Sequence, residues 1–262
     1  PLSLKEDMPF VVNENIYLSD DEYPTRYSSD VTTQYLNGYS FAFSGFTPVR
    51  YIPSTGKLSY AQTVKVRVSC AASRNDKGKM LKTTDENKSR VQRLAHNPEM
   101  SEDYEQRGQR GIGGYELLVV TPSEWVSHFD EYKAFYDARG LRTKIVPLED
   151  IYTSSEGRDE QEQIRAFISH EYENEDIMMV LLGGDVKLVP YRGLYCYVNH
   201  DYEDYGIPAD MYYVCLDGTW NNDNDTLWGE EGEEDFLPEL AIARLPFNNE
   251  EQFNNIMHKT MT

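Results

Sequence analysis

The sequence contains few cysteines and no long apolar run. Its three cysteines among 262 residues are an odd number and too few for a disulfide scaffold, so at most one bridge can form within the chain. No segment approaches the roughly 20 apolar residues that a membrane-spanning helix needs, so we expect no membrane span. The sequence opens at Pro1 with neither an initiator Met nor a charged-then-apolar leader, and we expect that any targeting peptide has been removed.

Basic residues are also scarce. The chain has 25 Lys and Arg against 45 Asp and Glu, for a formal net charge of -20. This charge repels phosphate backbones and anionic lipid, so we expect no nucleic-acid partner, and it favours cations or cationic substrates. A strongly charged surface would also simply keep a secreted protein soluble. Charge alone therefore does not choose between these alternatives.

Phosphate-binding signatures are missing as well. Gly183, Gly184 and Asp185 follow an apolar run, but neither Lys-Ser nor Lys-Thr comes after them, as a phosphate loop requires. The glycine-rich stretch 111–114 precedes a predicted strand, whereas a dinucleotide fingerprint follows one. A nucleotide-binding function is therefore disfavoured, and Asp185 is left as a residue that orients a neighbour or takes a metal.

Three regions of different character follow one another. Residues 1–75 predict a small all-β, sandwich-like domain, with alternating valines in 63–70 and hairpin turn chemistry in 49–60. Residues 76–113 are rich in charge and glycine and predict a linker. Residues 114–262 alternate short apolar runs with amphipathic stretches, which predicts an α/β domain with a parallel sheet flanked by helices.

Within the α/β region, ligands are expected beyond the carboxyl ends of the strands. After the first strand, Thr121 and Glu124 predict a capped helix that ends at Gly140. The other predicted helices cover 159–172 and 248–259. Strands are predicted at 115–120, 143–148, 177–182, 211–216 and 239–245.

Oxygen-bearing side chains crowd the segment after the apolar run 211–216. Their alternation followed by a delayed Glu resembles the ligand rhythm of calcium loops. Thr226 and Gly232 occupy the places where an EF-hand needs Gly and Glu, so only a shorter loop could apply. A solvated acidic turn is the alternative, and magnesium or manganese would also suit such ligands. The candidate metal ligands are Asp217, Asn221, Asp223, Asp225 and Glu230.

Residues for substrate recognition and catalysis are less clear. Asp210 stands before a predicted strand, where its carboxylate could bind a guanidinium in a bidentate manner or simply cap a turn. Cys215 lies in an apolar run and is expected to be a buried, inert thiol. Cys196 and His200 are four residues apart, which does not guarantee contact. The residues alone therefore show no convincing catalytic pair.

Six segments, in this order, resemble the first half of the catalytic domain of gingipain-like cysteine peptidases. The segment FAFSGFTPVRYIPSTGKLSYAQTVKVRV is similar to the β-rich pro-segment that precedes this domain in the family. The resemblance covers about residues 39–70 and 115–258. The six segments are YELLVVTPSEW, ARGLRTKIVPLEDI, QIRAFISHEYEN, IMMVLLGGDVKLVPY, PADMYYVCLDGTWNNDNDTLWGEE and PELAIARLPFNNEEQ.

The resemblance implies a caspase-like α/β fold, a zymogen, calcium dependence, and a secreted, periplasmic or cell-surface bacterial location. It also implies a Cys/His dyad that hydrolyses protein or peptide substrates after basic residues. In the family this dyad lies in the second half of the domain, with the His in a Gly-His-Gly context. Neither motif occurs here, so we expect no catalytic residue in this chain, which would be inactive without that missing half. Asp210 falls where arginine-specific members carry their specificity carboxylate.

The linker contains a possible processing site. If the enzyme selects arginine, Arg107 and Arg110 in QRGQRG are candidates for self-cleavage, because flexible glycine-rich segments are readily nicked. Whether the β domain inhibits, assists folding or is cleaved off stays open, as does arginine versus lysine specificity. One alternative is a non-catalytic calcium-binding surface protein on the same scaffold. An unrelated α/β hydrolytic or nucleotide-binding enzyme is the other.

Overall fold

The chain divides into two compact units. The first consists of Pro1–Thr33 and Ala42–Ser73, and the second of Gln34–Phe41 and Arg74–Thr262. The short segment 34–41 therefore belongs with the C-terminal region, although the sequence predicts one boundary near residue 75. None of the helices in the described ranges is long and apolar enough to cross a membrane. The computed structural model describes residues 12–69, 80–104, 114–175, 177–198 and 202–261.

The first unit contains a short helix and a β-hairpin. Helix α1 is Glu14–Tyr17, and strands β3 (Val49–Ile52) and β4 (Lys57–Tyr60) pair antiparallel, as the turn chemistry predicts. The strand expected over 63–70 is wrong for residues 63–69, which form no strand. Val66 is 80% exposed there, because no neighbouring sheet buries the apolar face of that segment. Among the described strands, β3 and β4 form a two-stranded sheet, to which Tyr23 adds one isolated bridge at Tyr51, and no second sheet of a sandwich packs on them.

A second hairpin carries a tight turn into the second unit. Strands β1 (Thr32–Leu36) and β2 (Tyr39–Phe43) form a two-stranded sheet joined by Asn37 and Gly38. Both turn residues have positive φ, 51° and 81°, which is the conformation of a type I′ turn. A Cβ at Gly38 would lie 2.4 Å from the Cα of Leu81, so only glycine fits this turn.

The described part of the predicted linker, residues 80–104, contains regular structure. Residues 85–94 form helix α2 (Asp85–Leu94), capped by Thr84, and a 3₁₀ helix η2 (Pro98–Asp103) follows. Val91 is the only buried residue of α2, so the sequence shows no periodic apolar stripe that would have predicted this helix. Together with Leu36 and Tyr39, Val91 forms a small core. The linker prediction is therefore wrong for 80–104, and Arg107 and Arg110 lie outside the described residues.

The second unit is built on a four-stranded parallel sheet, which confirms the predicted α/β class. Its strand order is β10-β7-β5-β6, and every neighbouring pair is parallel. Strand β5 is buried along its whole length because helices cover both faces of the sheet. The strands are β5 (Leu117–Thr121), β6 (Thr143–Pro147), β7 (Met179–Gly183) and β10 (Ala241–Leu245).

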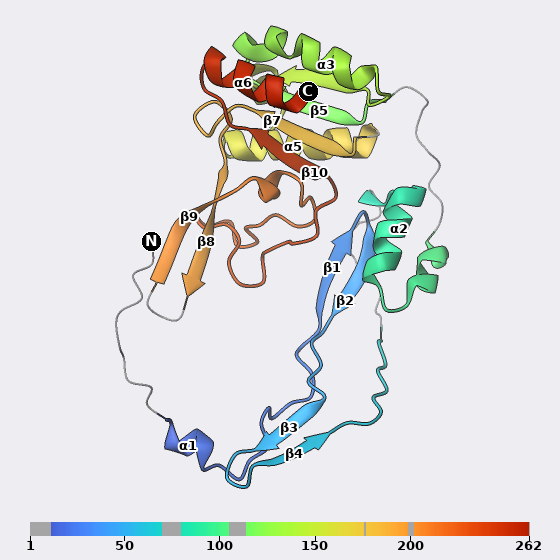
Figure 1. Cartoon of the computed structure of the whole chain (residues 1–262), viewed down its shortest axis with the longest axis vertical. Helices are drawn as coiled ribbons and strands as arrows, with labels where there is room; N and C mark the ends of the chain where they lie inside the picture. The colour runs from blue at the N-terminus through green and yellow to red at the C-terminus, as the bar shows by residue number, and fades with distance from the viewer. Residues whose placement is uncertain (1–11, 70–79, 105–113, 176, 199–201, 262) are drawn as a thin grey trace. The chain divides into compact units, whose positions relative to one another are not determined.

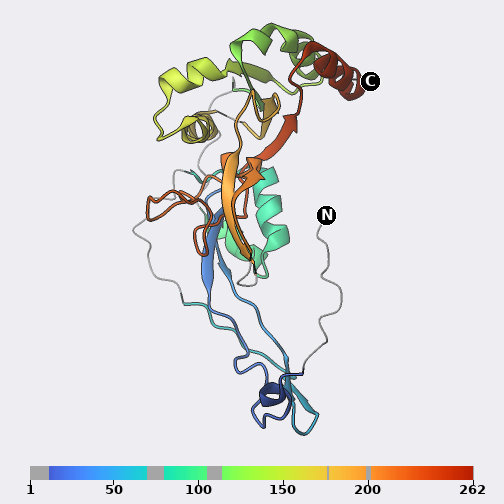
Figure 2. The ribbon, with the colours of Figure 1, turned by 90° about the vertical axis from the view of Figure 1, so that its left-hand side faces the viewer.

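Alternate residues of β5 enter two different cores. Leu117 and Val119 pack with η3 (Ser123–Phe129), α3 (Asp130–Asp137) and α6 (Glu250–Met261), whereas Leu118 and Val120 pack with α4 (Leu148–Ser154) and α5 (Glu160–Asn174). Figure 1 shows α3 and α6 on one side of the sheet and α5 on the other, and Figure 2 shows the same layers from the side. The two cores fix the sheet between its helices.

The segment between β7 and β10 differs most from expectation. Strands β8 (Arg192–Val198) and β9 (Tyr202–Ala209) form an unpredicted antiparallel hairpin. The run expected as a strand at 211–216 begins instead as the 3₁₀ helix η4 (Asp210–Tyr213). Residues 212–216 are all buried but form no strand. The apolar run therefore correctly indicated burial, and the prediction of a strand there is wrong. The predicted cap at Thr121 is also wrong, because the next helix, η3 (Ser123–Phe129), has Pro122 at its N-cap and no side-chain cap, and the Thr121 hydroxyl donates to the Gly183 carbonyl oxygen over 2.7 Å.

Candidate functional site

The carboxyl edge of the sheet is closed by its own polar contacts near β5 and β7. The chain passes from β6 back over β5 to β7, so the topological switch point lies between β5 and β7. A Cβ at Gly183 would lie only 2.7 Å from the Phe129 ring, so this point is packed. Next to it, Asp185 accepts a hydrogen bond from Asn248 Nδ2 over 2.7 Å. Asp185 therefore orients the turn after β10.

The acidic segment contains two groups of carboxylates where the sequence predicted one. Asp217, Asp235 and Glu239 form a buried group, and each offers a carboxylate oxygen within 4.8 Å of the others. Asp223, Asp225 and Glu230 form a second group, mostly exposed. The prediction that Asp217 shares a site with these three residues is therefore corrected. Asp235 and Glu239 were missed, because they lie 18 or more residues from Asp217 in sequence and only the fold joins them.

Glu239 is the centre of the buried group. It is 3% exposed, and its carboxylate accepts hydrogen bonds from the backbone N–H groups of Leu216 (2.7 Å) and Asn37 (3.2 Å). Burial raises the pKa of Glu239 to about 8, and the negative charges of Asp217 and Asp235 act in the same direction. Ionised carboxylates in this environment need a compensating positive charge.

Arg165 supplies part of that compensation from helix α5. Its guanidinium donates to the carbonyl oxygens of Tyr212 (3.0 Å), Cys215 (2.7 Å) and Gly218 (3.1 Å). Burial lowers the pKa of Arg165, and nearby acidic groups that include Asp235 and Glu239 oppose this shift. The side chain thus holds the backbone around Asp217 and places a cation near the buried carboxylates.

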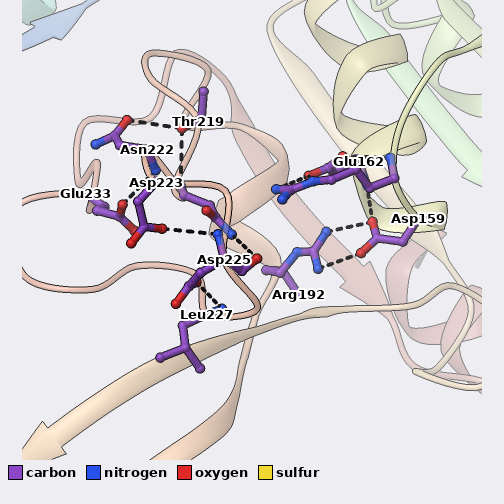
Figure 3. A network of polar contacts seen from close by, with 11 residues as sticks. Asp159, Glu162, Arg192, Thr219, Asn222, Asp223, Asp225, Leu227 and Glu233 are labelled. Atoms are coloured by element: carbon purple, nitrogen blue, oxygen red, sulfur yellow. Dashed lines mark hydrogen bonds and ion pairs between the residues drawn. The ribbon is translucent and has the colours of Figure 1, made fainter.

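The exposed group forms a tight turn (Figure 3). Asp223 Oδ1 accepts from the backbone N–H of Asp225 over 3.1 Å, and Asp225 Oδ1 accepts from that of Leu227 over 2.6 Å. Partial burial raises the pKa of Glu230, as do the charges of Asp225 and Asp223. These contacts are those of an Asx-stabilised loop, which was the alternative to a cation site.

Asn221 lies at the start of this turn but is itself buried, with 1% exposure. Its Nδ2 donates to the Asp225 carbonyl oxygen over 3.0 Å. Its Oδ1 is buried and accepts no hydrogen bond from the residues that the structure describes. A buried amide oxygen in this state suits a ligand to a hard cation.

A second arginine fixes the acidic segment to α5. Arg192, at the start of β8, is 4% exposed and binds Asp159 in a bidentate manner at 2.9 and 2.7 Å (Figure 3). Its guanidinium carbon lies 4.0 Å from the centroid of the Trp228 ring. Asp159 also caps α5 by accepting from the Glu162 N–H over 2.8 Å. One ion pair therefore joins the helix, the hairpin and the acidic segment.

Asp210 has an internal partner. Its two carboxylate oxygens accept from Arg244 Nε (2.8 Å) and from the terminal nitrogen Nη2 (2.6 Å). Nη1 of Arg244 donates to the carbonyl oxygens of Gly184, Asp185 and Val189. The bidentate guanidinium expected from a substrate is thus supplied by the chain itself.

One open cavity lies beside this region. It has a volume of about 350 Å³ and does not include Asp210 in its lining. Its lining residues are Gln161, Val186, Pro190, Tyr191, Gly193 and Gly206. Asp210 is therefore placed to hold the base of the β8–β9 hairpin and not to face this cavity.

The thiols agree with the sequence in part. Cys215 is fully buried, as predicted, and burial raises the pKa of its thiol, which makes it a poor nucleophile. Cys196 lies in β8 and is partly exposed, but His200 lies outside the described residues, so the structure does not test their pairing.

The structure consists of a β-rich N-terminal region followed by a helix-flanked parallel α/β region. The family comparison agrees. The sequence model of peptidase family C25 matches residues 113–262, and that of the C25 propeptide matches residues 2–97. Because the first match covers more than half of the chain, the chain belongs to peptidase family C25, and the resemblance to gingipain-like peptidases is confirmed at that level.

Solved structures and curated proteins were compared in the same way. The complex of Porphyromonas gingivalis RgpB pro- and mature domains is 23% identical over 56% of this chain and 28% of its own, with a TM-score of 0.39. The Arg-specific cysteine proteinase gingipain R is 23% identical over 58% of this chain and 29% of its own, with a TM-score of 0.39. A structure described as that of a protease is 15% identical over 62% of this chain and 30% of its own, with a TM-score of 0.40. This chain spans less than a third of each, and no curated protein matches it.

The Asp210–Arg244 pair predicts a stability effect. We expect Asp210→Asn to lower the free energy of unfolding by about 2–4 kcal/mol, because the Arg244 side chain is only 12% exposed and would lose its charged partner. Denaturant unfolding measures this, with Asp30→Asn as the control, since its pair with Arg26 is exposed and should contribute less than about 1 kcal/mol. Unchanged stability together with lost binding of an arginine-based inhibitor would instead assign Asp210 to substrate.

The Asp159–Arg192 pair predicts a pH effect. Although burial acts to raise it, the pKa of Asp159 is lowered overall by its bonds with Arg192 and the Glu162 N–H. The stabilisation is therefore present above the unfolded value of about 3.9 and is lost as the pH falls through the lower folded value. We expect Asp159→Asn to cost about 2 kcal/mol at pH 7, less than a fully buried pair because Asp159 is 34% exposed.

That cost should shrink as the pH falls below about 4. Urea unfolding of both proteins across pH 3–7 measures the difference. The exposed Asp130→Asn variant controls for the change from carboxylate to amide. A difference that does not vary with pH would show that the ion pair is not its cause.

Proposed function

We propose that this chain is the pro-segment and the first part of the catalytic domain of a secreted or cell-surface cysteine endopeptidase. The family match over residues 113–262 carries this proposal. The adjoining propeptide match supports synthesis as a zymogen. The nucleophilic thiol and its histidine would come from sequence beyond these 262 residues, which contain no Gly-His-Gly segment. The chain by itself would then not hydrolyse peptides.

We propose further that the complete enzyme cleaves after basic residues. The net charge of -20 supports this preference, because it attracts cationic segments of a protein substrate. We do not assign the selection to Asp210, since Arg244 occupies both of its oxygens. A selecting carboxylate elsewhere in the complete domain would perform this role.

Calcium is the cofactor that we propose for the buried acidic group. Asp217, Asp235 and Glu239 would supply hard carboxylate oxygens, and the buried Oδ1 of Asn221 is suited to join them. A bound calcium ion would neutralise charge that otherwise raises the pKa of Glu239. The chain's own residues would then fix the backbone from 216 to 239. Asp223, Asp225 and Glu230 form a weaker, exposed alternative.

Self-processing tests the proposed activity. We expect the full-length protein to cut its own chain after Arg107 or Arg110, and iodoacetamide to prevent the cut by alkylating the nucleophile. Intact-mass spectrometry before and after incubation measures it. Replacing both Arg107 and Arg110 by Gln should abolish these fragments, whereas Arg93→Gln, a change on helix α2, should leave them. Identical fragments from the double variant would refute processing at these two arginines, and activity that survives alkylation would refute the cysteine mechanism.

Chelation tests the proposed cation site. With free calcium 100-fold above its Kd, binding adds about 2.7 kcal/mol to the free energy of unfolding, which is roughly 5–10 °C in Tm for a domain of this size. We expect EDTA to remove this increment and Asp235→Asn to abolish it. Asp223→Asn, the same change in the exposed group, should retain most of it. A Tm that EDTA does not change would refute the site, and loss of the increment only in Asp223→Asn would move it to the exposed turn.

A further inference from the structure

Residues of the propeptide match are hydrogen-bonded directly to residues of the peptidase match. The turn of the β1–β2 hairpin lies in the propeptide match, and Tyr172 and Glu239 lie in the peptidase match. Although they are far apart in sequence, these residues belong to the same compact unit. The contact is therefore an interface between the two regions, and its centre is Asn37.

Asn37 is completely buried and its donors are matched to acceptors on the peptidase side. Its Nδ2 donates to the Tyr172 hydroxyl over 2.9 Å and to the Glu239 carbonyl oxygen over 3.1 Å. Its backbone N–H donates to Glu239 Oε1 over 3.2 Å. One residue thus makes three hydrogen bonds across the boundary, and none of them is screened by solvent.

The turn geometry explains why an asparagine stands at this position. Its φ of 51° lies in the left-handed region, which asparagine tolerates better than most residues. The amide supplies two N–H donors in one plane, and Arg90 Nη1 lies 3.5 Å from its Oδ1. Asn37 therefore both tolerates the positive φ of the turn and supplies the amide that binds Tyr172 and Glu239.

Two basic side chains of the propeptide region surround this contact. Lys82 Nζ donates to the Glu175 carbonyl oxygen over 2.7 Å and lies 4.3 Å from the centroid of the Tyr172 ring. Arg90 Nη2 donates to the Pro238 carbonyl oxygen over 2.9 Å. Both cations donate to backbone carbonyl oxygens of the peptidase region, so charge-assisted hydrogen bonds reinforce the interface.

We propose that the Asn37–Gly38 turn is the anchor that keeps the propeptide region docked on the peptidase region after the linker at 105–113 is cut. Its receptor is formed by Tyr172 and the backbone and carboxylate of Glu239, and its occupant is this segment of the same chain. Docking requires no hydrolysis, so the inference stands apart from the proposed peptidase activity.

The experiment uses the 262-residue chain with the recognition sequence of an unrelated protease placed in 105–113. After the cut, size-exclusion chromatography and biolayer interferometry measure whether the two pieces stay together and with what Kd. Asn37→Gly keeps the turn but removes the amide, and should raise the Kd about 10-fold to 100-fold. Asn37→Asp keeps the shape but replaces Nδ2, the donor to the Tyr172 hydroxyl and the Glu239 carbonyl oxygen, by an acceptor, so it should weaken docking further.

Two more variants make the result decisive. Tyr172→Phe keeps the ring and removes the hydroxyl on the receptor side, and should raise the Kd about 10-fold without a change in the propeptide region. Asn13→Asp is the matched control, because it makes the same chemical change at the exposed cap of α1 and retains the cap. Its Kd should stay within about twofold of the wild type.

Kd values within about twofold of the wild type for Asn37→Gly, Asn37→Asp and Tyr172→Phe would overturn the anchor. So would equal weakening by Asn13→Asp. Failure of self-processing in the full-length protein would leave this measurement unaffected, because the cut is made by the added protease.

Discussion

The irregular parts of the chain between β7 and β10, on either side of the β8–β9 hairpin, depend on arginine side chains that bind their backbone. A buried segment without regular strands must still pair its carbonyl groups. Arg165 takes three carbonyl oxygens around Tyr212–Gly218, and Arg244 takes those after β7. Arg192 ties the start of β8 to the first turn of α5 through Asp159. These guanidinium groups replace hydrogen bonds that a sheet would have provided, and they hold the backbone next to Asp210 and Asp217.

The same arrangement concentrates negative charge. Glu239 is bonded both to the acidic segment and to the propeptide region. One of its oxygens accepts from Leu216 in the acidic segment, and the other accepts from Asn37 in the propeptide region. The buried carboxylates that we propose as calcium ligands therefore share a residue with the docking interface. Calcium binding would therefore change the affinity of the docking interface, because both depend on the ionisation and orientation of the Glu239 side chain.

Sequence patterns predicted the sheet well and the site poorly, for a physical reason. The strands β5 and β7 are short apolar runs that are almost wholly buried, whereas β6 at the sheet edge is partly buried, and such apolar runs are local in sequence. The buried carboxylates are not, because Asp217 meets Asp235 and Glu239 only after an irregular excursion of the backbone. The anchor did carry a local signal, the Asn-Gly pair between two aromatic strands, which is the strongest short hairpin signature. Its partner Glu239 lies 202 residues away, and no pattern of spacing reveals that.

Asp210 shows how correct chemistry can lead to an incomplete assignment. A carboxylate at this position does bind a guanidinium in bidentate geometry, as its setting indicated, but the guanidinium belongs to Arg244 at the end of β10. Arg244 also binds carbonyl groups after β7, so the pair connects adjacent parallel strands to the base of the β8–β9 hairpin. A substrate arginine would have to displace a partner that makes these additional bonds in a site with little solvent. Because breaking a pair of this kind leaves an uncompensated charge, the observed contacts give Asp210 a structural role in this chain.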